Sequence, residues 1–172
     1  MQTLWEELVQ LGYAHRLFAY GQAVEGRGDV AHGALAHTRA SRDTDTTGLA
    51  VLRTGQCSTW EALPTVEGLS VAVFDPADIA ARLTRMLNLL LAYPVPLVAR
   101  LVPVAAIAPD QLIMRSKVGV DHRGRASIRT VPSPLRTEAT EAVSTERLRR
   151  TIEPVAEELA ARLDLAFDVR RN

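Results

Sequence analysis

The chain has 172 residues, of which 47% are hydrophobic and 23% are charged, and its 20 basic residues balance 20 acidic ones. This length suffices for a buried core, so a single domain over residues 1–172 is expected. Zero net charge excludes a protein-wide field that attracts nucleic acid or an anionic membrane, so such a partner would need a local basic patch.

A single cysteine, Cys57, excludes an intramolecular disulfide and a cysteine-based zinc site, which fits a reducing compartment. Residues 1–20 show no basic leader followed by an apolar run, so no signal peptide is expected. The mostly apolar residues 79–107 are interrupted by arginines and prolines, which excludes an ordinary membrane span. These features predict a cytoplasmic protein with no membrane partner.

The first expected element is a helix over residues 3–20. Thr3 and Glu6 fit a capping box, in which each side chain satisfies a backbone group at the helix start. Residues at helical spacing then form one stripe: Leu4, Leu8, Leu11, His15 and Phe18. The glycines in residues 25–29, EGRGD, predict a break in regular structure after this helix.

Three strands are expected next. Residues 32–41 and 49–55 flank a connection rich in Thr, Asp and Gly, a pattern typical of an antiparallel pair. Residues 68–76 form a third run, which is apolar enough to lie at the centre of a sheet.

A second helix is expected over residues 75–93. Asp75 is placed to cap it, Pro76 takes the first helical position, and Asp78 lies near the positive end of the helix dipole. Apolar residues recur on one wide face of this helix: Ile79, Leu83, Met86, Leu87, Leu90 and Leu91. Such a face indicates a helix packed on a sheet.

The remainder of the chain begins with a segment rich in proline. Its prolines predict an irregular path at about residues 94–112, in which any strand is short or lies at an edge. A hairpin over residues 117–131 follows. The last helix is expected from Ser144 onward, and Pro154 should kink it or mark its true start.

Together these elements predict an α+β fold with the order α-β-β-β-α-β-β-α, in which three helices pack on an antiparallel sheet of about five strands. Three stretches carry a resemblance to a known fold beyond the order of elements: residues 77–101, residues 118–132 and residues 144–160. The order resembles the type III secretion chaperone-like fold, which the YbjN-like family of small bacterial proteins shares. Asp121 to Gly124 fits the Asp-x-x-Gly turn of that pattern, whereas the proline-rich segment is longer than the pattern expects.

This resemblance implies a non-enzymatic and often dimeric module that binds another protein through its sheet and helices. A roadblock-type dimerisation domain, which also mixes helices and strands, is a near alternative. If the protein is such a module, dimerisation and exposed apolar surface near the proline-rich segment are expected.

The polar residues predict neither a metal site nor a cofactor site. The histidines, at positions 15, 32, 37 and 122, show no metal-binding spacing, and a zinc site needs three or four converging ligands. Asp43 and Asp45 are not followed by the combination of a turn glycine and a distal glutamate that a calcium loop has. Side-chain bonds to the backbone of a turn explain this pair.

No catalytic residues are predicted either. Asp75 and Asp121 each end an apolar run, as the metal ligands of nucleases do, but a two-metal site needs several convergent carboxylates. The sequence neighbours of Cys57 provide no base or cation that would activate its thiol. The chain is therefore expected not to be an enzyme.

The hairpin remains as a candidate site. Strand alternation places Val118, Val120, Ala126 and Ile128 on the inner face and basic residues on the outer face. Six basic residues and one acidic residue lie between Arg115 and Arg136. The candidate polyanion-binding residues are Arg115, Lys117, Arg123, Arg125 and Arg129. The stretch has no aromatic residue for base stacking, so a solvated or protein-facing surface is the alternative explanation.

Two functions therefore follow from the sequence. The first is a non-enzymatic protein-binding or chaperone-like module, dimeric with itself or bound to another protein. The alternative is a nucleic-acid-binding accessory protein that uses the basic outer face of the hairpin at residues 115–131.

Overall fold

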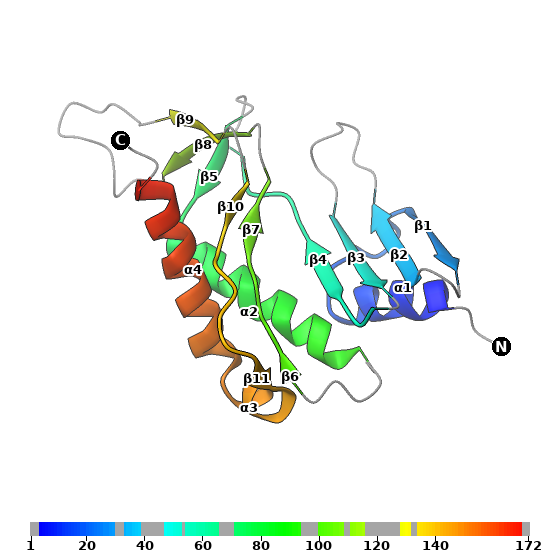
Figure 1. Ribbon diagram of the computed structural model, residues 1–172. Coiled ribbons are helices and arrows are strands. Elements are labelled where there is room, and N and C mark those ends of the chain that lie inside the picture. The colour runs from blue at the N-terminus through cyan, green and yellow to red at the C-terminus, as the bar shows by residue number, and fades with distance from the viewer. Residues whose placement is uncertain are drawn as a thin grey trace. The chain divides into compact units, whose positions relative to one another are not determined.

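A computed structural model describes residues 4–29, 33–38, 47–52, 54–65, 71–93, 100–108, 111–115, 128–131 and 134–169 (Figure 1). Its helices are α1 (Leu4–Ala14), α2 (Pro76–Ala92), α3 (Thr145–Arg150) and α4 (Ile152–Val169). Its strands are β1 (Val24–Asp29), β2 (Gly33–Thr38), β3 (Thr47–Leu52), β4 (Cys57–Trp60), β5 (Ala72–Phe74), β6 (Arg100–Leu101), β7 (Ala106–Ile107), β8 (Gln111–Arg115), β9 (Ile128–Val131), β10 (Leu135–Arg136) and β11 (Val143–Ser144). The predicted α+β class is confirmed.

The chain divides into two compact units. Unit 1 contains residues 1–62 and 85–99, and unit 2 contains residues 63–84 and 100–172. Helix α2 runs across the division, so it contributes its first part to unit 2 and its last part to unit 1. The expectation of one domain over residues 1–172 stays a prediction, which a folding experiment described below tests.

Unit 1 is built on an antiparallel sheet with the order β1-β2-β3-β4, in which each strand pairs with its neighbour in sequence. Along β2, residues alternate between half-buried and buried, as expected for a strand with one face on a core. The core residues come from α1, the segment after it, the sheet and the end of α2: Leu8, Phe18, Ala34, Ala36, Leu49, Val51, Leu89 and Tyr93.

Strand β1 corrects the sequence-based expectation that residues 25–29 break regular structure. These residues pair in register with β2, from Val24 opposite Thr38 to Asp29 opposite Gly33. Close packing accounts for Gly26, because a Cβ atom there would lie 2.1 Å from the backbone oxygen of Leu35 in β2 and 2.4 Å from Nε1 of Trp5 in α1. The missing side chain therefore makes room for a tryptophan in a strand, rather than marking a turn.

Unit 2 contains smaller sheets. In one, β5 pairs with β8 in parallel and β8 pairs with β9 in antiparallel orientation. A parallel pair requires a crossover connection, and here α2 lies in the chain between β5 and β8. The observed sheets are thus more divided than the predicted antiparallel sheet of about five strands, and one pair is parallel.

In the core of unit 2, helix α4 contacts strand β5. The ring of Phe167 stacks on that of Phe74, with 5.4 Å between ring centroids and an interplanar angle of 2°. Buried residues recur along α4 at intervals of three and four, which is the spacing of one helix face: Ala156, Leu159, Ala160, Leu163 and Phe167.

The predicted last helix is interrupted at Thr151, where α3 ends, and α4 begins at Ile152. Pro154 therefore lies in the first turn of α4, where its missing N–H group costs no helical hydrogen bond. Ser144 caps α3, because its Oγ atom accepts a hydrogen bond from the backbone nitrogen of Arg147 at 3.2 Å. This agrees with the expectation that Pro154 marks the true start of a helix.

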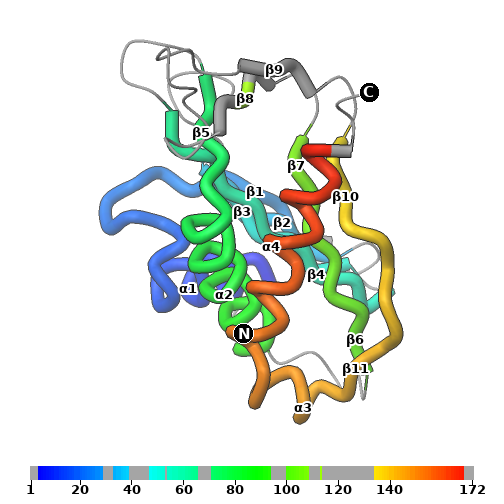
Figure 2. Tube along the Cα trace, turned by 90° about the vertical axis from the view of Figure 1, so that its left-hand side faces the viewer, coloured from blue at the N-terminus to red at the C-terminus, as the bar shows by residue number. Residues whose placement is uncertain are grey.

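The proline-rich segment contains short strands where it is described. Residues 100–108 hold β6 and β7, each of two residues. Both pair with the stretch before α3 in antiparallel orientation: Leu101 lies opposite Val143, and Ile107 opposite Leu135. Figure 2 shows β6 and β7 running beside β11 and β10. The two paired stretches, residues 100–107 and residues 135–144, are together called the ribbon.

Candidate functional site

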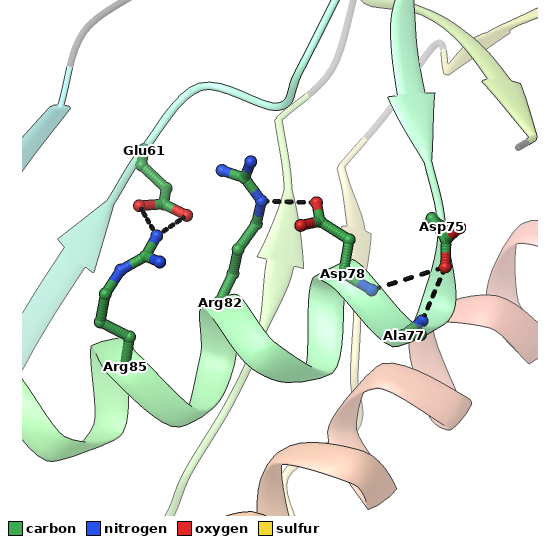
Figure 3. Close-up of polar contacts among 6 residues, drawn as sticks. All are labelled: Glu61, Asp75, Ala77, Asp78, Arg82 and Arg85. Atoms are coloured by element: carbon green, nitrogen blue, oxygen red, sulfur yellow. Dashed lines mark hydrogen bonds and ion pairs between the residues drawn. The ribbon is translucent and has the colours of Figure 1, made fainter.

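Asp75 acts as the predicted helix cap. Its Oδ1 atom accepts hydrogen bonds from the backbone nitrogens of Ala77, at 2.9 Å, and Asp78, at 3.5 Å (Figure 3). Asp78 in turn forms an ion pair with Arg82, one turn along the helix, with 2.6 Å between the atoms. These contacts give both aspartates a structural role at the start of α2.

The predicted basic hairpin is described only in part. The first predicted strand, at residues 117–121, lies outside the described residues. Strand β8, which precedes it and ends at Arg115, pairs with β9 in antiparallel orientation, with Ile113 opposite Arg129. Lys117, Arg123 and Arg125 lie outside the described residues, as do the side chains of Arg115 and Arg129. Polyanion binding by this hairpin therefore stays a prediction.

Some of the remaining histidines and aspartates considered as candidates lie in the described residues, and others do not. His32, His122, Asp43, Asp45 and Asp121 lie outside the described residues. His15 follows α1 and His37 lies in β2, and both are half-buried. In the ranges that the structure describes, no three His, Cys, Asp or Glu side chains gather as a metal site would require.

Cys57 is half-buried in β4. Burial raises the pKa of its thiol, because the thiolate loses more solvation than the neutral thiol does. The protonated form is a poorer nucleophile than the thiolate.

The ribbon has an exposed apolar edge in the proline-rich segment, which the sequence located only approximately. Between the β6 and β7 pairings, Ala105 directs its backbone toward Thr137. The backbone nitrogen of Thr137 donates to the oxygen of Ala105 at 2.9 Å, and the Ala105 nitrogen donates to Oγ1 of Thr137 at 3.1 Å. Thr137 is buried, so these bonds fix the strand at this point.

The backbone groups of the residues on either side of Ala105 point away from Thr137. From Val102 to Ala108 the residues alternate between exposed and less exposed, which indicates an extended chain. In an extended antiparallel strand, alternate residues direct their backbone groups to opposite edges. Because Ala105 faces Thr137, the backbone groups of Val104 and Ala106, and of Val102 further along, point to the outer edge.

That outer edge also presents apolar side chains. Val102 is 44% exposed and Val104 is 38% exposed. Within the described ranges, β6 pairs only with β11 and β7 only with β10, so no strand lies against this edge there. The residues Val102, Val104 and Ala106 are called the open edge below. Exposed apolar surface was expected near the proline-rich segment, and these valines confirm it.

Comparison of the chain with protein-family models, with curated proteins and with solved structures finds no match to any of them. Among the helices described, none combines the length and apolar character needed to cross a membrane.

Proposed function

We propose that the chain is a non-enzymatic, chaperone-like protein-binding module that pairs with a second copy of itself through the open edge. The observation that supports this most directly is the pair of hydrogen bonds between Ala105 and Thr137. They direct the neighbouring backbone groups outward. An edge with unpaired backbone groups and apolar side chains is a template for strand addition.

Two-fold symmetry favours a second copy as the occupant. Antiparallel pairing of this strand with itself, centred on Val104, places Val102 of each chain opposite Ala106 of the other. All three of these residues have a backbone N–H group on the outward side. Pro103 lacks an N–H group, but by the same alternation its backbone faces the ribbon, so no bond to the second copy is lost there.

Sedimentation equilibrium over a range of concentrations tests this proposal. The wild-type chain should dimerise, and the double variant Val102→Lys, Val104→Lys should weaken the dimer at least about tenfold, because lysines on an edge repel each other and oppose strand pairing. Leu165→Lys is the matched control, since Leu165 is also apolar and 64% exposed but lies on α4. A wild-type chain that stays monomeric up to millimolar concentration would overturn the proposal.

A further inference from the structure

Unit 2 has an open pocket between one end of the ribbon and the helices that follow it. Its volume is about 860 Å³, within the range of small-molecule sites. Arginines enter it from three elements, namely Arg100 of β6, Arg147 of α3 and Arg162 of α4. Sequence analysis gave no sign of this group, because Arg100 is far along the chain from the other two.

Arg100 is held in place without losing its charge. Its Nε and Nη2 atoms donate hydrogen bonds to the backbone oxygen of Ala142 at 3.2 Å and 2.7 Å. A carbonyl oxygen carries no formal charge, so these bonds orient the guanidinium without neutralising its positive charge. The guanidinium has five N–H donors, and those not used here remain available to a ligand.

Arg147 is fixed through its backbone. Its nitrogen donates to Oγ of Ser144 at 3.2 Å, and its oxygen accepts a hydrogen bond from Oγ1 of Thr151 at 3.0 Å. In the described part of the chain its guanidinium has no acidic partner. Arg162 differs, because it forms an ion pair with Glu158 on the same helix.

The charge balance of the pocket is therefore positive. Since Arg162 and Glu158 neutralise each other, Arg100 and Arg147 are left with one acidic lining residue, Glu141. Part of the remaining lining is apolar: Ala142, Val143, Pro154 and Val155. A ligand that fits this lining carries an anionic group and a small apolar body.

We propose that this pocket binds a small amphipathic anion. Arg100 and Arg147 hold its phosphate or carboxylate group, and the aliphatic lining contacts its apolar part. Guanidinium groups suit both head groups because planar N–H pairs match two oxygens. This inference does not rest on the open edge, since the pocket needs no second copy.

Nuclear magnetic resonance titration of the whole chain tests the site with defined probes. Hexyl phosphate and hexanoate should shift backbone amide signals of residues 140–162, whereas hexanol, which has the same chain length and no charge, should not. The anion that binds with the higher affinity shows whether the pocket prefers a phosphate or a carboxylate group. Shifts from hexanol equal to those from the anions, or no shifts from either anion at millimolar concentration, would overturn the proposal.

Charge variants sharpen the test. Arg147→Gln should weaken binding of the preferred anion about tenfold, because it removes a charged hydrogen-bond donor. Arg136→Gln is the control, since Arg136 is exposed in the same unit and does not line the pocket. Glu141→Gln should instead strengthen binding, by removing a repulsive charge. If Glu141→Gln leaves the affinity unchanged and Arg136→Gln weakens it as much as Arg147→Gln, the pocket is not the site.

Discussion

The two units use their strands differently. In unit 1, strands that follow one another in sequence also pair in that order, from β1 to β4. In unit 2, β8 pairs with β9, its neighbour in sequence, but the pairings of β5 with β8, β6 with β11 and β7 with β10 join distant parts of the chain. Sequential pairing gives a continuous sheet, whereas the distant pairing leaves the ribbon interrupted between β6 and β7.

Both of the proposed binding features lie in unit 2. The exposed residues Val102 and Val104 lie between the β6 and β7 pairings of the ribbon, and the arginine-lined pocket lies at one end of the ribbon, beside β6 and β11. Unit 1 has a core built from α1, the sheet and the end of α2, and it also exposes Tyr20 and Leu52. On this view unit 1 is mainly a structural body and unit 2 carries the interactions, and the predictions below test that contrast.

The largest expected effect comes from the core of unit 1. Leu49→Ala, at a fully buried position, should lower the free energy of unfolding by about 2–5 kcal/mol. Leu52 lies in the same strand but is 43% exposed, so Leu52→Ala should lower the free energy of unfolding much less than Leu49→Ala does. Urea unfolding followed by tryptophan fluorescence measures both, and Trp5 and Trp60 both belong to unit 1.

The same variant tests the predicted single domain. If residues 1–172 unfold cooperatively, Leu49→Ala should shift the fluorescence transition and the helical circular dichroism transition by equal amounts. A shift in fluorescence alone would show that the two units unfold independently, which would contradict one domain.

A glycine comparison should give the next largest effect. Gly33 has a φ of +116°, and a Cβ atom there would lie 2.1 Å from the backbone oxygen of Val51. Gly21 has a φ of +82° and open space around it. Gly21→Ala should therefore cost only backbone strain, about 1–2 kcal/mol, and Gly33→Ala clearly more. Equal costs in chemical denaturation would show that the strands at Gly33 are not so closely packed.

Removal of the α2 cap should have a smaller effect. Asp75→Ala should destabilise the protein by about 1 kcal/mol, because two backbone nitrogens lose their acceptor. Asp78→Ala removes an ion pair within the helix and should cost about 0.3–0.5 kcal/mol. Thermal unfolding of both variants ranks them, and a larger loss for Asp78→Ala would contradict the assigned cap.

The chemistry of Cys57 gives the smallest effect. Because burial raises the pKa of its thiol in the folded state, iodoacetamide should modify the native chain more slowly than the urea-unfolded chain near pH 8. The neutral thiol's contribution to stability is present below the unfolded pKa, about 8.5, and is lost as the pH rises through the folded value. Equal rates for the native and unfolded chains would show an exposed, unperturbed thiol.

Sequence reasoning succeeded where the cause is local. The start of α2 was predicted from Asp75 and Pro76, because a cap involves only residues of the first turn. Strand β1 was missed, because the close packing that accounts for Gly26 involves Leu35 and Trp5 on other elements. The parallel pairing of β5 with β8 was missed for the same reason, since it depends on distant residues.

The candidate site shows the same division. The prolines of this segment indicated short or edge strands, and the hypothesis of a protein-binding module indicated exposed apolar surface near them, which Val102 and Val104 provide. The direction of the open edge depends on the bonds between Ala105 and Thr137, which lie far apart in sequence. No spacing in the sequence could indicate that contact.

Hydrogen exchange at two protein concentrations tests the central proposal, pairing through the open edge, most directly. The amides of Val104 and Ala106 should exchange rapidly at low micromolar concentration and gain at least about tenfold protection at millimolar concentration, as dimer forms. The Ala105 amide, which donates to Thr137 within the chain, should be equally protected at both concentrations. Protection of Val104 and Ala106 that does not change with concentration, while the chain dimerises, would contradict the account.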